Sequence, residues 1–323
     1  MDIQIAQRSR AKHGIPPREA PMLQYFESRG HRAEFLAGHQ LENLRDGVLL
    51  VMGNMIWYPE LLQKLKQTSP SQRPFVVLWH SEPLPPPRAA GLPLPWLSLR
   101  EVLKIALRDR RVTDVYSNYW MLRSLHRQDL VDRLVVSTRG RQDFLAERGI
   151  ASDWIPLCYG PERGHPMALE RDIDVLFLGM MDVPRRQKII QRFEARGLRV
   201  MVKGEWGDPS CWGDARTELL NRTRILLNFP RTAGEMSGMR FFLGISNLAL
   251  VVSEPIYRPD PYIPGEHFVS TSLEDMPEVV QHYLQNEAER VAITTAAWQH
   301  VQKNVNLDYA GGRLLELMEQ SEK

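Results

Sequence analysis

The chain is poor in cysteine and has no long apolar run. Its two cysteines, Cys158 and Cys211, are too few and too far apart for a disulfide framework or a set of metal ligands. No run of about 18 uncharged apolar residues occurs, and the first residues, MDIQIAQRSRAKHG, lack the apolar centre of a signal peptide. We therefore expect a cytoplasmic protein without integral membrane contact.

The motifs of several common enzyme classes are also missing. The nine histidines show neither HExxH nor Cys/His spacing, and no Asp-x-Asp run marks a Mn²⁺ or Mg²⁺ site. Without GxSxG, Walker A or GxGxxG, the hydrolase, ATPase and dehydrogenase classes lose their usual support. The sequence predicts neither a metal site nor a cofactor.

An excess of charge of one sign is absent as well. The 41 Lys and Arg residues nearly balance 39 Asp and Glu residues, for a net charge of +2, which does not indicate a nucleic-acid-binding surface. Arg108, Arg110 and Arg111 form a local cluster, for which a solvated helix end is favoured over a patch for an anionic partner. Affinity for a membrane surface stays open but has no support in the sequence.

Length and composition predict two globular domains. The 323 residues exceed what one hydrophobic core organises, and 43% hydrophobic with 25% charged residues is ordinary for globular proteins. Short apolar runs alternate with segments of helical period, which builds a parallel sheet with helices on both faces. The predicted fold class is α/β, with two Rossmann-like domains that bind ligands at the carboxyl ends of their strands.

The expected elements follow from these patterns. We expect strands at Arg32–Leu36, Gly47–Met52, Phe75–Trp79, Val112–Tyr116, Arg133–Ser137, Ile173–Leu178, Leu198–Val202, Arg224–Asn228 and Leu250–Ser253. We expect helices at Ala20–Ser28, Pro59–Gln67, Leu97–Arg108, Gly140–Arg148, Arg185–Ala195, Asp214–Asn221, Gly238–Asn247, Pro277–Leu284 and, as one amphipathic stretch, Ala288–Leu317.

A change of composition marks the boundary between the domains. Over Leu157–Pro161 aromatic and turn residues replace periodicity, and Gly164 and Pro166 follow closely. We expect an N-terminal domain over 1–163, a C-terminal domain over 164–305, and a final helix over 306–323 that packs back on the first domain. The linker at Tyr159 and Gly160 would let the domains close.

Two loops of the second domain suit an anionic ligand. The strand ending at Gly179 leads into a helix with Arg185, Arg186 and Lys188, where backbone N–H groups and guanidinium groups would favour a diphosphate. A solvated basic helix is an equally good interpretation. After the next strand, Lys203 and Gly204 would approach the ligand, and Trp206 could stack on a nucleobase or cover the core.

In the first domain the strand ending in His80 runs into a proline-rich loop. His80 and Glu82 are candidates for the base that takes a proton from an acceptor hydroxyl, although a structural role is as likely on these residues alone. Asn54 and Asn118 lie at other loop ends and would line the acceptor side, with turn and cap roles favoured for each.

The run NFPRTAGEMSGMRFFLGISNLALVVSEP, over 228–255, carries the most specific signal. A strand ends in Asn228, Gly238 and Arg240 start a helix, and the next strand ends in Ser253 and Glu254. This pattern resembles the nucleotide-sugar half of GT-B glycosyltransferases, in the family-4-like, spore-maturation-protein (CgeB-like) branch. The similarity covers about the last 150 residues at motif level, and the first half is covered by topology and by the WIPLCYGP linker.

The resemblance implies a binding set and one departure. Donor-binding candidates are Gly179, Arg185, Arg186, Lys188, Lys203, Gly204, Trp206, Arg231, Gly238, Met239, Arg240, Ser253 and Glu254. Family 4 uses two Glu residues eight apart; Glu235, a catalytic candidate, matches the first, but position 243 is Leu. The ribose would then be held by Glu254 or by backbone groups, unless the donor site is degenerate.

The resemblance implies a metal-independent glycosyltransferase, with a hexosyl group favoured. Cationic groups would stabilise the negative charge that grows on a nucleoside-diphosphate leaving group, in place of a metal ion. The acceptor could be a glycan, a metabolite, a protein or a nucleic acid. Two alternatives stay open: a non-catalytic binding or scaffold protein, motivated by Leu243, and a nucleotide-sugar epimerase.

Overall fold

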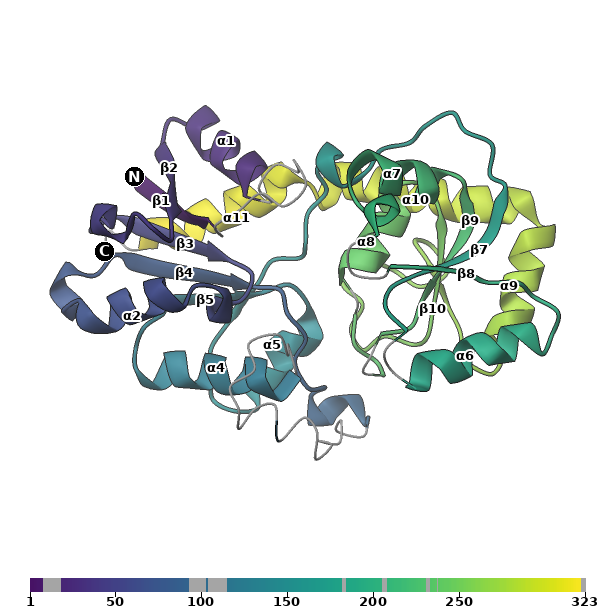
Figure 1. The fold of residues 1–323 in the computed structure, drawn as a ribbon, viewed down its shortest axis with the longest axis horizontal. Coiled ribbons are helices and arrows are strands. Elements are labelled where there is room, and N and C mark those ends of the chain that lie inside the picture. The colour runs from purple at the N-terminus through teal and green to yellow at the C-terminus, as the bar shows by residue number, and fades with distance from the viewer. Residues whose placement is uncertain are drawn as a thin grey trace. The chain divides into compact units, whose positions relative to one another are not determined.

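The computed structural model describes residues 1–7, 19–92, 103, 115–181, 184–204, 208–230, 233–236 and 238–320. The chain forms two compact units, the first made of Met1–Pro156 with Leu307–Lys323 and the second of Leu157–Asn306. Within the described residues each unit holds one sheet of parallel strands with helices on both faces (Figure 1). The predicted α/β class is confirmed.

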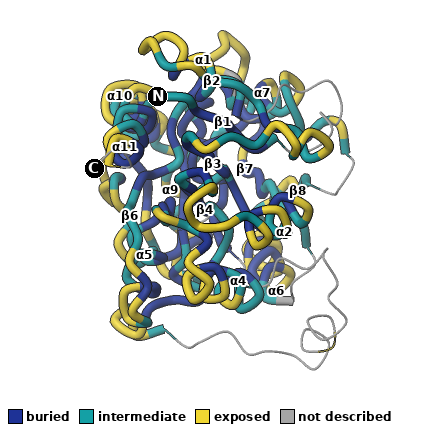
Figure 2. Tube along the Cα trace, turned by 90° about the vertical axis from the view of Figure 1, so that its left-hand side faces the viewer, coloured by how far each residue is buried: buried dark blue, intermediate teal, exposed yellow. Residues whose placement is uncertain are grey.

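The first unit is built on a sheet with strand order β2-β1-β3-β4-β5-β6. Its strands are β1 (Asp2–Gln7), β2 (Arg32–Ala37), β3 (Val48–Met52), β4 (Phe75–His80), β5 (Arg133–Val136) and β6 (Asp153–Trp154). The middle strands carry apolar residues on both faces because helices cover both, and they are buried in Figure 2.

Helices of the first unit divide between the two faces of this sheet. They are α1 (Ala20–Ser28), α2 (Pro59–Gln67), α4 (Val115–Arg127), α5 (Arg139–Ala146) and α11 (Leu307–Glu319). Side chains of α2, α4 and α5 share one core with alternate residues of β3 and β4. Helices α1 and α11 pack together on the opposite face (Figure 1).

The second unit has strand order β11-β10-β9-β7-β8. Its strands are β7 (Ile173–Leu178), β8 (Met201–Lys203), β9 (Thr223–Asn228), β10 (Leu250–Ser253) and β11 (Val269–Ser270). Its helices are α6 (Pro184–Glu194), α7 (Gly213–Asn221), α8 (Gly238–Ser246), α9 (Met276–Gln285) and α10 (Glu287–Asn304). Helices α6 and α9 pack on one face, and α7, α8 and α10 on the other.

Several sequence expectations need correction. The strand predicted at Val112–Tyr116 is wrong over its described part, because α4 begins at Val115. The helix predicted at Leu97–Arg108 lies outside the described residues except for Leu103. The single stretch Ala288–Leu317 is two helices, α10 and α11, separated at Val305 and Asn306. Strands β1, β6 and β11 and most of α4 were not predicted.

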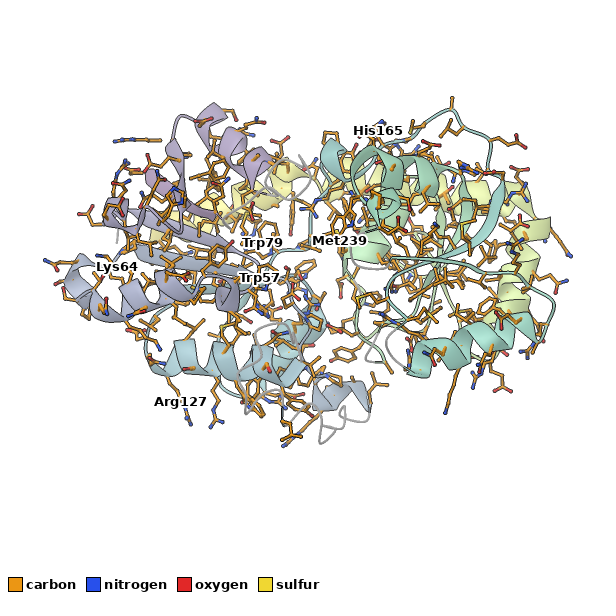
Figure 3. All side chains as sticks on the ribbon, viewed as in Figure 1. Trp57, Lys64, Trp79, Arg127, His165 and Met239 are labelled. Atoms are coloured by element: carbon orange, nitrogen blue, oxygen red, sulfur yellow. The ribbon has the colours of Figure 1, made fainter. Side chains whose placement is uncertain are left out.

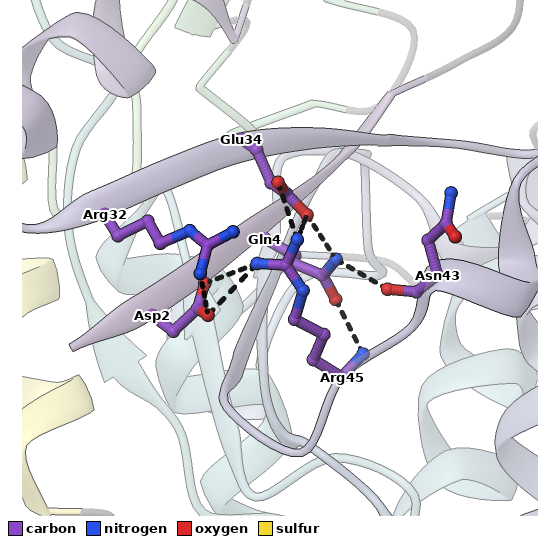
Figure 4. A network of polar contacts seen from close by, with 6 residues as sticks. All are labelled: Asp2, Gln4, Arg32, Glu34, Asn43 and Arg45. Atoms are coloured by element: carbon purple, nitrogen blue, oxygen red, sulfur yellow. Dashed lines mark hydrogen bonds and ion pairs between the residues drawn. The ribbon is translucent and has the colours of Figure 1, made fainter.

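A polar network fixes the loop beside the edge strand of the first unit (Figure 4). The Arg45 guanidinium donates to Asp2 at 3.0 Å and to Glu34 at 3.0 Å. The Gln4 amide, 3% exposed, donates to Glu34 and accepts from the Arg45 backbone N–H. The network borders a concavity of about 460 Å³ lined by Glu34, Phe35, Leu36, Gln40, Glu42, Asn43, Leu44 and Arg45. It therefore holds residues 40–45 against β1 and β2.

The C-terminal helix, α11, packs against α1 within the first unit. The Tyr25 hydroxyl donates to the Asp308 carbonyl at 3.4 Å, and Arg29 pairs with the Asp308 carboxylate at 3.2 Å. The Tyr25 ring lies so close to Gly311 that an added Cβ would come within 2.3 Å of a ring carbon. The close approach of α1 and α11 thus requires glycine at position 311.

We expect Gly311→Ala to destabilise the first unit by about 1–3 kcal/mol, because the methyl group would overlap the Tyr25 ring. Gly312→Ala is the matched control: its Cβ would meet only the Tyr25 hydroxyl, at 3.7 Å, and alanine favours a helix over glycine by about 0.5–1 kcal/mol. Urea denaturation measures both variants. Equal free energies of unfolding for the two would contradict the packing described.

Candidate functional site

The topology of the second unit marks one place for a ligand. Strands β7 and β9 are neighbours in the sheet, although β8 lies between them in the chain, so the connections from β7 and from β9 run to opposite sides. Open parallel sheets bind ligands at such a switch point, outside the carboxyl ends of the strands. In this unit the switch point lies beyond Leu178 and Asn228.

Arg240 spans this switch point. Its Nε donates to the Leu178 carbonyl at 2.6 Å, and one terminal nitrogen contacts the Asn228 side-chain oxygen at 3.4 Å and the Phe229 carbonyl at 3.5 Å. The guanidinium carbon lies 4.6 Å from the centroid of the Phe177 ring, which the Phe229 ring stacks against at 4.2 Å. Arg240 is 7% exposed, so its guanidinium charge is buried at the carboxyl ends of β7 and β9.

Two glycines bring the backbone of neighbouring strands together at the same edge. The Gly179 N–H donates to the Lys203 carbonyl at 2.7 Å, and a Cβ at Gly204, which has φ +119°, would come within 2.6 Å of the Gly179 nitrogen. A Cβ at Gly179 would meet the Arg240 guanidinium at 2.6 Å. Glycine at 179 therefore makes room for Arg240 to reach Leu178.

Glu254 and Arg185 form an ion pair beside this edge. An Arg185 terminal nitrogen lies 2.5 Å from one Glu254 carboxylate oxygen, and another donates to the Pro230 carbonyl at 3.0 Å. Glu254 is 4% exposed, and its other oxygen, Oε1, has no hydrogen-bond partner among the described residues. Burial raises the pKa of the Glu254 carboxyl, and Arg185 opposes that shift.

The other predicted donor cations differ in their surroundings. Arg186 is buried and donates to the Met180 carbonyl at 2.8 Å, with its guanidinium 5.3 Å from the Phe177 ring centroid. Lys188 is exposed to solvent on α6, and Lys203 lies 3.9 Å from Asp208. Arg186 and Arg240 donate to carbonyls at or just after the end of β7, and Arg185 pairs with a carboxylate. Their role as a cluster of cations for a diphosphate stays a prediction.

Two of the remaining donor candidates lie at the start of α8. Gly238 and Met239 begin that helix, and a Cβ at Gly238 would come within 3.1 Å of Leu157. Ser253 is fully buried, where its hydroxyl accepts from the Asn228 amide at 2.9 Å. Glu235 is part of the described chain and is half-buried. The candidates Trp206 and Arg231 lie outside the described residues.

Leu243 has a structural explanation. Its side chain is 4% exposed and packs in the core with Leu176, Leu226 and Ala249, on the sheet face that α7 and α8 cover. A carboxylate at this position would be buried among apolar side chains. The carboxylate that the structure does place at the strand edge is Glu254.

We expect Arg240→Met to lower the free energy of unfolding by about 1–3 kcal/mol, because the Leu178 carbonyl would lose a charged donor. The replacement of Arg240 by Ala should cost stability for the same reason. Arg192→Met, exposed on α6, is the control and should change stability by no more than about 0.5 kcal/mol. Chemical denaturation of both variants checks this; an unchanged Arg240→Met protein would refute the bridging role.

The first-unit candidates lie in the interior. His80 has no exposed surface, and its burial together with the nearby Arg141 guanidinium lowers its pKa from 6.5 to about 3. A neutral, enclosed imidazole of such low basicity does not suit a general base near pH 7. Glu82 follows it in the loop and is partly exposed. The base roles of both remain predictions, disfavoured for His80.

Asn54 and Asn118 hold the loops of this unit in place. Both are fully buried; the Asn54 amide donates to the Asn118 oxygen at 2.8 Å, and the Asn118 amide donates to the Pro83 carbonyl at 2.8 Å. The Asn54 oxygen also accepts from the Ile56 N–H, as a cap does. The turn role expected of Asn54 thus describes it, whereas Asn118 lies inside α4 and does not cap it. Asn118 instead ties α4 to the loop after β4.

Arg141 was missed by sequence reasoning. It is 5% exposed, and one guanidinium nitrogen donates to the Ser81 carbonyl and to the Ser137 hydroxyl, both at 2.7 Å. It therefore joins the strand ends of β4 and β5, as Arg240 joins those of β7 and β9. An arginine near the start of a helix gives no sequence signal for such a role.

We expect the stability of the first unit to fall as the pH drops below about 6.5, down to about 3. The unfolded chain protonates His80 near pH 6.5 and the folded chain near pH 3, so unfolding takes up a proton between these values. His80→Gln should flatten this dependence, and His39→Gln, an exposed control, should leave it unchanged. Thermal unfolding at pH 7 and pH 4.5 measures it. A His80→Gln protein with the full acid dependence would exclude His80 as its source.

Neither a metal cluster nor a membrane-spanning helix is found in the part of the chain that the structure describes. No group of three or more His, Cys, Asp or Glu side chains there is arranged to hold a metal ion. No described helix is both long and apolar enough to cross a bilayer.

Comparisons with known proteins agree with this geometry. Residues 185–316 match the glycosyl transferase-like family. HepE of Anabaena, solved with UDP-glucose, is 9% identical with a TM-score of 0.62, over 99% of this chain and 100% of HepE. Sucrose-phosphate synthase of Thermosynechococcus elongatus is 10% identical with a TM-score of 0.60, over 99% of this chain and 98% of that protein.

A variant of S. aureus TarM, in a complex that contains UDP, is 8% identical with a TM-score of 0.60. That match covers 87% of this chain and 58% of TarM, so the chain spans less than two thirds of TarM. No curated protein matches the sequence. The fold is therefore that of the GT-B glycosyltransferases. The glycosyl transferase-like family match lies mostly in the second unit and ends in α11 of the first.

Proposed function

We propose that this chain is a glycosyltransferase whose second unit binds a nucleoside-diphosphate sugar at the β7–β9 switch point. One observation carries the proposal: a buried carboxylate, Glu254, leaves one oxygen without a partner at the edge where Arg185 and Arg240 hold positive charge. An unpartnered buried oxygen is costly, and a ligand hydroxyl that donates to it would remove that cost. UDP-bound relatives of the same fold support a nucleotide as that ligand.

The chemistry follows from the charges at this edge. When the bond between the sugar and the diphosphate breaks, negative charge grows on the leaving oxygen. Arg185, Arg240 and Lys203 are already placed around the strand ends, so they stabilise that charge without large rearrangement. The start of α8 adds backbone N–H groups of the kind that bind phosphate. We propose that these groups supply the positive charge for the reaction without a divalent ion.

Arg185 would change partners when the donor binds. In the structure it neutralises Glu254, and a diphosphate offers it a second anion. A ribose hydroxyl would then take the place of Arg185 as the hydrogen-bond donor to Glu254. Glu254 thereby serves the purpose for which family 4 uses the residue at position 243, so Leu243 does not make the site degenerate.

The finer assignments belong to the proposal as well. A hexose is the proposed sugar, in line with the UDP-glucose complex of HepE. The first unit, which contains most of the N-terminal domain predicted over 1–163, would hold the acceptor. We also propose that the chain belongs to the family-4-like, spore-maturation-protein branch and that it is located in the cytoplasm.

The direct test is calorimetric titration with a panel of UDP-, GDP- and ADP-sugars, followed by assay of nucleoside-diphosphate release. We expect one donor to bind. Without an acceptor, water should hydrolyse this donor slowly and release the nucleoside diphosphate, and EDTA should not reduce the rate. If no nucleotide sugar binds, the proposed function is wrong and a scaffold role is preferred.

Glu254→Gln should weaken the affinity for the donor by roughly 10- to 100-fold, because a charge-assisted hydrogen bond contributes about 1.5–3 kcal/mol. The variant should also lose the preference of the native protein for the ribose donor over its 2′-deoxyribose analogue. Glu278→Gln, an exposed carboxylate on α9, is the matched control. Native affinity and native ribose preference in Glu254→Gln would remove Glu254 from the site.

A further inference from the structure

One face of helix α4 is buried against the core of the first unit. Asn118, Leu122 and Leu125, spaced by four and three residues, are buried. Leu122 and Leu125 pack in the core with residues of β3 and β4, and Asn118 bonds to Asn54 and Pro83. The inward face thus accounts for the position of the helix.

The opposite face of α4 has a composition that the core does not explain. Tyr116, Trp120, Arg123 and Arg127 are spaced by four, three and four residues, so at about 100° per residue they form one stripe on the outer side. Trp120 is 41% exposed, and its ring centroid lies 6.1 Å from that of Tyr116. The Arg127 side chain extends away from the helix into solvent (Figure 3).

The charge of this stripe has one sign. Residues 115–128 contain no Asp or Glu, and the first carboxylate, Asp129, follows the end of the helix. Among the described residues, Arg123 and Arg127 have no ion pair. An exposed arginine pair on a helix without a carboxylate, next to an exposed tryptophan, is an unusual combination for a purely solvated helix face, where both signs alternate.

We propose that the outer face of α4, formed by Tyr116, Trp120, Arg123 and Arg127, docks on an anionic lipid surface. Tryptophan and tyrosine rings sit at the headgroup level of bilayers, where an apolar body meets water. Arginine side chains reach the lipid phosphates from the same level. The helix would lie on the surface, with its inward face still packed on the sheet.

A lipid surface fits these four residues better than the other macromolecular partners. The face offers no aliphatic side chain to fill a protein pocket, and two arginines with a net charge of +2 for the whole chain are weak support for nucleic acid. A bilayer needs neither a pocket nor a groove.

The experiment is co-sedimentation of the full chain with vesicles of phosphatidylcholine alone and of phosphatidylcholine with phosphatidylglycerol. We expect binding to the anionic vesicles, little to the neutral ones, and loss of binding in about 0.5 M salt, where charges are screened within a few Å. R123Q with R127Q should reduce binding on the order of 30-fold, at about 1 kcal/mol for each arginine. Trp120→Ala should reduce it further when combined with this pair.

The matched control is K64Q with K66Q on α2, which removes the same charge from a different exposed helix. Circular dichroism should show that all these variants fold as the native chain does, and vesicle binding is measured without a donor, so the result does not depend on the proposed function. The proposal is overturned by an absence of vesicle binding, by equal binding to neutral vesicles, or by equal losses in the α2 and α4 variants.

Discussion

A buried arginine at the end of two neighbouring strands is the interaction on which the second unit depends most. Arg240 bonds to carbonyl or amide oxygens beyond β7 and β9 and rests on the stacked rings of Phe177 and Phe229. Its charge thereby stabilises an edge of the sheet where several backbone carbonyls point outward. In the proposed function the same charge attracts the anionic diphosphate, so stability and ligand binding would share one group.

The charges beside Arg240 affect both the stability of the fold and the proposed binding of phosphate. A carboxylate near Arg240 would be favourable for the fold and unfavourable for phosphate binding. The structure places Glu254 beside Arg185, with one oxygen still unpartnered. The ion pair neutralises Arg185 in the protein alone, and the second Glu254 oxygen remains a hydrogen-bond acceptor. The first unit repeats the strand-end arginine with Arg141, but there a buried, neutral His80 is its neighbour.

The sequence predicted most of the framework and only part of the site. Apolar runs bounded by turns gave strands such as Ile173–Leu178 almost to the residue, because a strand covered on both faces needs continuous apolar side chains. Strand β1 was not predicted because Asp2, Gln4 and Gln7 interrupt its apolar pattern, although Ile3 and Ile5 are fully buried. Residue types also predicted cations at the strand ends. Which carbonyl or carboxylate each one contacts depends on tertiary geometry, so Arg185 with Glu254 could not be read from spacing.

We propose that a nucleoside-diphosphate sugar binds where β7 and β9 end, and a crystal structure of the full chain with UDP-glucose tests this. We expect diphosphate oxygens within hydrogen-bond distance of Arg185 or Arg240, a ribose hydroxyl on the second oxygen of Glu254, and a lengthened contact between Arg185 and Glu254. A nucleotide bound elsewhere, with that ion pair unchanged, would contradict it.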